Sequence, residues 1–66
     1  MKGKQLARKL RRAGVAIDTK RGKGGHYLLT YRGRQTTLPM HGDTDLGPVF
    51  IKRICRQLGL DPEEIF

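Results

Sequence analysis

The sequence predicts a small α+β fold in which an α-helix is followed by three β-strands and a second α-helix (αβββα). Two observations point to it. Apolar residues recur at helical spacing near both ends of the chain, and the middle holds short runs of strand-forming residues separated by glycine-rich turns. We expect the 66 residues, 1–66, to form one domain. A chain of this length buries only about 60% of its unfolded surface, so both helices should pack on the sheet.

The first expected element is an amphipathic helix over residues 2–13. Leu6, Leu10 and Ala13 fall at helical spacing, with Ala7 beside them. Gly14 follows where a left-handed glycine commonly ends a helix. Basic side chains cover the rest of the helix surface: Lys4, Arg8, Lys9, Arg11 and Arg12.

Three strands are expected next, in an antiparallel meander. In residues 15–20, Val15 and Ile17 alternate with Ala16 and Asp18, which is typical of a half-buried strand, and residues 26–31 and 34–39 are rich in strand formers. The turns between the strands are short, which favours antiparallel pairing of neighbours. Pro39 ends the third strand, because proline cannot donate a hydrogen bond to a sheet.

A second helix is expected over residues 48–59, after a polar loop. Pro48 suits the first helical turn, and Gly59 ends the helix. Asp61 and Pro62 then suit the start of one further turn. The apolar stripe of the second helix consists of Phe50, Ile51, Ile54 and Leu58.

Two helices can cover one face of a three-stranded sheet and leave the other face open for binding. Side chains alternate between the two faces along a strand. The bulkier set in the second strand is expected to pack under the helices, and it consists of Tyr27, Leu29 and Tyr31. His26, Leu28 and Thr30 would then lie on the open face, although a shift of one residue would reverse this assignment.

The charge of the chain favours a polyanion or an acidic protein as partner. The chain has 14 Lys and Arg, 6 Asp and Glu, and a net charge of +8. Residues 1–34 hold 11 basic side chains and a single acidic one, Asp18, whereas residues 35–66 hold three basic and five acidic ones. No apolar run approaches the roughly 20 residues of a membrane-spanning helix, and no signal peptide is recognisable. We therefore expect no contact with a membrane.

Metal, cofactor and disulfide chemistry are not expected. The single cysteine, Cys55, cannot form an internal disulfide, which fits a reducing, cytoplasmic compartment. Its apolar neighbours indicate a buried structural thiol rather than a nucleophile. No group of His, Cys, Asp and Glu has the spacing of metal ligands. Nucleotide hydrolysis is rejected because no Ser or Thr follows a Gly-Lys pair.

The stretch GKGGHYLLTY, residues 22–31, is the most distinctive in the chain. Glycines let a backbone approach a ligand closely, and Lys20, Arg21 and Lys23 supply charge for a phosphate. Two plainer interpretations stay open at this point: a flexible hairpin turn with solvated charges, and a polar histidine at the start of a strand.

The chain resembles the HicA family, the toxins of HicA–HicB toxin–antitoxin pairs, which are small mRNA interferases. The resemblance runs through RRAGVAI, GKGGHYLLTY, TTLPMHGD and IKRICRQLGLDPEEI, in that order, and covers nearly the whole chain. It implies that His26 is catalytic, that the fold is like a double-stranded-RNA-binding domain, and that a HicB-type antitoxin covers the active face. The family commonly has Ser before this histidine, where Gly25 stands here.

A ribonuclease that needs no metal requires a base near the 2′-hydroxyl, an acid near the leaving oxygen, and positive charge near the phosphorus. Histidine suits both proton-transfer roles because its ordinary pKa is about 6.5. His26 is the candidate for either role, and His41 is a possible second acid or base that could equally be a loop residue. The basic candidates for binding RNA are Lys20, Arg21 and Lys23 near the histidine, and Arg8 and Arg12 on the first helix.

Three other functions fit parts of the sequence. A non-catalytic RNA-binding module would have the same size, charge and sheet. A protein that holds an acidic partner on its basic face would share these features too. A DNA-binding protein is less well supported, because the first helix runs straight into a strand and forms no helix-turn-helix pair.

Overall fold

The computed structural model describes residues 1–20, 26–40 and 45–66. Helix α1 (Gly3–Arg12) is followed by strands β1 (Ala16–Asp18), β2 (His26–Tyr31) and β3 (Arg34–Pro39). Helix α2 (Pro48–Leu58) and the short 3-10 helix η1 (Pro62–Glu64) complete the chain. The predicted αβββα order is therefore confirmed, and the likeness to a double-stranded-RNA-binding domain stays a prediction.

The sheet is an antiparallel meander with the strand order β1-β2-β3. A two-residue turn joins β2 to β3, and both of its residues, Arg32 and Gly33, have positive φ angles of 48° and 81°. This left-handed geometry matches the twist of paired strands. It pairs Tyr31 with Arg34 and so sets the register along the rest of the two strands.

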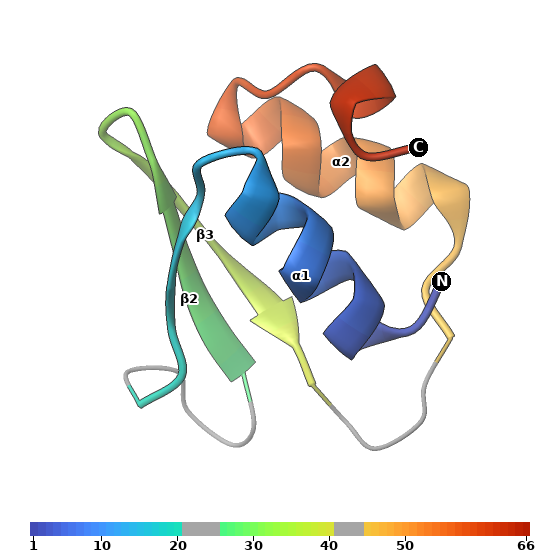
Figure 1. Cartoon of the computed structure of the whole chain (residues 1–66), viewed down its shortest axis with the longest axis horizontal. Helices are drawn as coiled ribbons and strands as arrows, with labels where there is room; N and C mark the ends of the chain where they lie inside the picture. Colours follow the sequence, from blue (N-terminus) through green and yellow to red (C-terminus); the bar gives the residue numbers. More distant parts are fainter. Residues whose placement is uncertain (21–25, 41–44) are drawn as a thin grey trace.

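Both helices pack on one face of the sheet (Figure 1). Leu6 and Leu10 of α1 are fully buried, as are Leu29 of β2 and Leu38 of β3. From α2 the core receives Ile51, Ile54, Cys55 and Leu58. The predicted cores of both helices are thus confirmed, except that Ala13 and Phe50 are only half-buried, and the predicted burial of Cys55 is confirmed as well.

The helix ends follow the predicted signals. Ala13 caps α1 before Gly14, whose φ is 100°, and Gly59 caps α2 with a φ of 74°. Pro48 begins α2, and the side chain of Asp61 accepts a hydrogen bond from the backbone N–H of Glu63 at 3.0 Å. The first strand is shorter than predicted. Residues at both ends of the 15–20 range lie outside β1. Val15, which precedes the strand, is buried in the core.

The segment before α2 lies beside the start of the chain (Figure 1). The amino group of Met1 donates to the carboxylate of Asp45 at 2.5 Å, and the N–H of Leu46 donates to the carbonyl of Met1 at 2.7 Å. These contacts hold the entry to α2 against the entry to α1. In the part of the chain that the structure describes, no helix is long and apolar enough to cross a membrane.

Candidate functional site

His26 is the first residue of β2 and lies at the end of the sheet opposite the Arg32-Gly33 turn. It pairs with Pro39, and alternation along β2 puts it on the same face as Leu28 and Thr30. That face is turned away from the helices, because Leu29 between them is fully buried. His26 itself is half-buried. The predicted assignment of the two faces therefore agrees with the register.

The open face of the sheet carries a shallow hollow of about 520 Å³. Its polar end is formed where β1 stops: the carboxylate of Asp18 accepts a hydrogen bond from the backbone N–H of Lys20 at 2.9 Å. Leu28 lies in the middle of the face, opposite Asp18 and Thr37. The lining residues are Ala16, Ile17, Asp18, Thr19, Lys20, Leu28, Thr30 and Gln35.

A second hollow, which we call the α1 groove, lies between α1 and the same end of the sheet, with a volume of about 290 Å³. Lys4, Arg8 and Arg11 line it from α1, where their spacing forms one helical stripe. The other lining residues are Ala7, Thr19, Tyr27 and Met40. Met40 packs close to the start of α1: a Cβ added at Gly3 would lie 2.9 Å from its sulfur.

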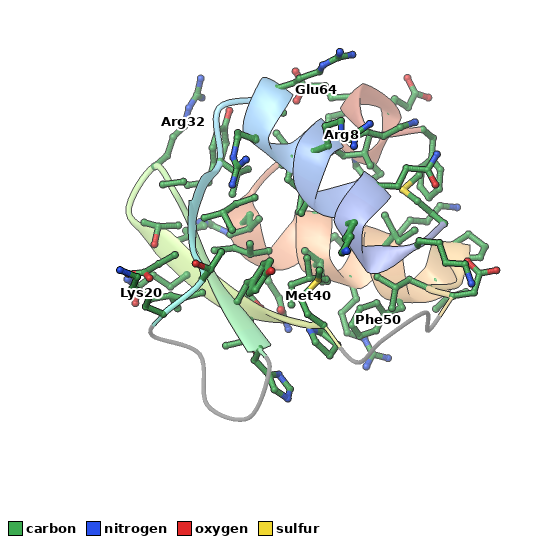
Figure 2. The ribbon with its side chains drawn as sticks, turned by 60° about the horizontal axis from the view of Figure 1, so that its bottom comes forward. Arg8, Lys20, Arg32, Met40, Phe50 and Glu64 are labelled. Atoms are coloured by element: carbon green, nitrogen blue, oxygen red, sulfur yellow. The ribbon has the colours of Figure 1, made fainter. Side chains whose placement is uncertain are left out.

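The hollow and the α1 groove meet at Thr19, which lines both. His26 and Tyr27 begin β2 at this end, and Figure 2 shows Lys20 beside the end of β1 and Met40 beneath α1. A chain-like ligand could therefore pass from the open face, around the end of β1, into a groove lined with cations. His26 lines neither hollow itself, but its neighbour Tyr27 lines the groove, and Leu28 on its own face lines the open-face hollow.

The structure separates two of the predicted RNA-binding residues. Arg8 lines the α1 groove, whereas Arg12 lines another hollow that also contains Glu64 and Phe66. Neighbouring Lys9 is used structurally, since its ammonium group donates to the carbonyl of Ile65 at 3.1 Å. Three further candidates, Arg21, Lys23 and His41, lie outside the described residues, as does Gly25.

Of the residues that line the α1 groove, sequence reasoning selected Arg8 as a binding residue and missed the others, of which Lys4, Arg11 and Tyr27 matter most to its chemistry. Lys4 and Arg11 could have been found, because positions 4, 8 and 11 lie on one helical face. Tyr27 was expected to be buried under the helices. It does pack against the core, but it is only half-buried, and it lines the groove.

No side-chain cluster within residues 1–20, 26–40 and 45–66 is suited to a metal ion, since no three of their His, Cys, Asp and Glu residues gather in one place. Cys55 is a free thiol and fully buried. Burial raises the pKa of this thiol above its ordinary value, and the nearby charge of Asp61 adds to the shift. The neutral thiol is therefore favoured, as expected for a structural cysteine.

Comparison with known proteins identifies the family. Residues 3–60 match the family described as the HicA toxin of bacterial toxin–antitoxin systems. The chain is also 38% identical over 60 residues to a probable mRNA interferase HicA from Pseudomonas fluorescens (strain Pf0-1), an alignment that covers 91% of this chain and 97% of the relative. The chain therefore belongs to the HicA toxin family.

Proposed function

We propose that this chain is the toxin of a type II toxin–antitoxin pair and cleaves mRNA without a metal ion, with His26 as its catalytic group. The similarity to a probable mRNA interferase supports the substrate class. The observation that carries the catalytic assignment is the position of His26. It opens β2 on the uncovered face, at the end of the sheet where the hollow meets the cation-lined α1 groove.

The reaction uses a nucleophile that RNA already contains. The 2′-oxygen attacks the adjacent phosphorus and loses its proton to a base, while the bond from phosphorus to the 5′-oxygen breaks and that oxygen takes a proton from an acid. The products are a 2′,3′-cyclic phosphate and a free 5′-hydroxyl. His26 serves as the base or the acid, and His41 is the candidate for the complementary role. Proton transfer of this kind contributes about 10²- to 10⁴-fold to the rate.

Basic side chains supply the positive charge that the transition state needs. Lys20 lines the open-face hollow, with Arg21 and Lys23 following it in the sequence, and these three are the candidates for contacting the reacting phosphate. Arg8 in the α1 groove, and Arg12 farther along the helix, are candidates for contacting the phosphate backbone.

A HicB-type antitoxin is the proposed protein partner, and it would inhibit by covering the open face of the sheet. The face fits this role because it is not packed against either helix and carries both polar and apolar side chains, such as Thr30 and Leu28. The positive charge of residues 1–34 favours an acidic partner surface.

The test is cleavage of a defined single-stranded RNA in the presence of EDTA by the parent, His26→Ala and Lys52→Ala, all purified identically. Lys52 lies on the outer face of α2, away from the hollow and the groove. We expect the parent and Lys52→Ala to leave cyclic phosphate ends, and His26→Ala to be slower by about 10²- to 10⁴-fold.

Equal cleavage by the parent and His26→Ala would refute the role of His26. Cleavage by the parent that occurs without EDTA and stops when EDTA is added would refute a mechanism that needs no metal. Binding without cleavage by every variant would instead indicate an RNA-binding module. Gly25→Ser would then test whether the hydroxyl common in the family restores activity.

A further inference from the structure

The α1 groove combines an aromatic ring with a row of cations. Tyr27 and Met40 give it an apolar part, and Lys4, Arg8 and Arg11 stand along α1 beside them. Among the described residues, no carboxylate lines the groove and none of these three cations forms a salt bridge. The surroundings therefore suit a ligand that is flat and apolar on one side and anionic on the other.

A nucleotide has this combination of properties. Base stacking on an aromatic side chain tolerates any sequence because every base has a π-face, and phosphates are held by Lys and Arg. Tyr27 suits the stacking role because its ring is anchored against the core while part of it stays accessible. Its neighbour in the chain, His26, faces the other side of the sheet.

We propose that the α1 groove holds one nucleotide of the RNA next to the bond that is cleaved, with its base on Tyr27 and its phosphate near Lys4, Arg8 and Arg11. The RNA strand then bends around the end of β1 at Thr19, which lines both the groove and the open-face hollow. This inference rests on the proposed function, since it takes RNA as the ligand. It makes Tyr27 a positioning residue and not a group that transfers protons.

The chain offers a direct probe of this contact. It contains no tryptophan and only two tyrosines, so Tyr31→Phe leaves Tyr27 as the only tyrosine fluorophore. Tyr31 lies at the other end of β2, about 13 Å away along the strand. We would titrate the full chain carrying Tyr31→Phe with a single-stranded oligonucleotide that has deoxyribose at every position and resists cleavage. Stacking of a base should quench the Tyr27 emission.

Substitutions then separate stacking from charge. Tyr27→Phe keeps the ring and should change the affinity by no more than about twofold, whereas Tyr27→Leu should weaken binding by about 5- to 100-fold. Arg11→Gln should weaken binding and reduce the salt dependence of log Kd by about 0.7, the value for one phosphate contact to a single strand. Lys52→Gln removes the same charge from α2 and should leave that slope unchanged.

The outcomes distinguish this inference from the proposed function. Unquenched Tyr27 emission at saturation, or equal affinity of Tyr27→Leu and the parent, would overturn the inference even if His26 proves catalytic. Quenching together with weaker binding by Tyr27→Leu would support it even if the parent does not cleave RNA. The quenching experiment uses a chain in which Tyr27 is unchanged. It therefore tests the stacking contact even if Tyr27→Leu proves unstable.

Discussion

The two faces of β2 differ in nearly every physical property although their residues alternate along one strand. Leu29 is fully buried in the core to which both helices contribute, and Tyr27 and Tyr31 pack against the same core. Leu28 and Thr30 line an open hollow, and His26 shares their face. One strand thus supplies a folding core on one side and a candidate reaction surface on the other.

Because the two faces differ in this way, substitutions on one face should affect stability and substitutions on the other should affect activity, and both effects can be measured. Changes on the covered face should alter the free energy of unfolding, and changes on the open face should alter RNA binding or cleavage. Tyr27 is the exception, because it packs against the core and also lines the α1 groove. It should therefore contribute to both.

The largest contrast in stability is expected between adjacent leucines. Leu29→Ala leaves a cavity in the core and should lower the free energy of unfolding by about 2–5 kcal/mol. Leu28→Ala should cost less than about 1 kcal/mol, because its side chain lines the open hollow. Urea denaturation followed by circular dichroism measures both values. Equal losses, or a larger loss for Leu28→Ala, would show that the assignment of the faces is wrong.

A smaller effect, this time on RNA affinity, is expected when the charge of Asp18 is removed, the single acidic residue among positions 1–34. Asp18 lies on the open face opposite Leu28, where its negative charge opposes a phosphate. Asp18→Asn keeps an oxygen that can accept the N–H of Lys20 and removes the charge. We expect RNA to bind about two- to fivefold more tightly at low salt, and the gain to shrink as salt is added.

Filter binding at several salt concentrations would measure this change, with Asp61→Asn beside η1 as the matched control. Asp61 caps η1 and lies outside the open-face hollow and the α1 groove. Weaker binding by Asp18→Asn, or an equal gain by Asp61→Asn, would count against the open face as the RNA surface.

The smallest effect should be a change in stability at alkaline pH that depends on Cys55, which lies in the core and not on the open face. Burial raises the pKa of Cys55 above its ordinary 9.0, so the folded state retains the thiol proton more strongly than the unfolded state. The resulting stability is present below the ordinary pKa and is lost as the pH rises through the raised value. Cys55→Ala should therefore lose less stability than the parent as the pH rises above 9.0. Parallel losses would exclude this contribution.

The sequence was sufficient for most of the fold because its signals are local. The left-handed glycines at 14, 33 and 59, the proline at 48 and the spacing of the leucines all act within a few residues. The predicted length of β1 was wrong because strand length depends on pairing with a distant part of the chain. Only the stretch opposite Leu28, Leu29 and Thr30 of β2 finds strand partners, and alternation within residues 15–20 cannot reveal that.

The candidate site was less predictable than the fold because it depends on where α1 lies. Arg8 and Arg12 are one helical turn apart, yet Arg8 lines the groove and Arg12 lines a different hollow, beside Glu64 and Phe66 of the C-terminal segment. Tyr27 was assigned to the correct face but to the wrong degree of burial. Alternation gives the face of a side chain, whereas the edge of a neighbouring helix decides how much of that side chain stays accessible.

The two-residue turn between β2 and β3 has a consequence for insertions and deletions. Register in this hairpin is counted from Arg32 and Gly33, and His26 stands five residues upstream of the last paired position, Tyr31. One residue inserted between Leu29 and the turn would shift the register of β2 by one. Every side chain upstream of the insertion would then move to the opposite face of the sheet, and Tyr27 would occupy the position of His26. Mutations that change length within this hairpin should therefore abolish folding and toxicity together, whereas length changes in the connection that precedes His26 leave the count from the turn unaltered.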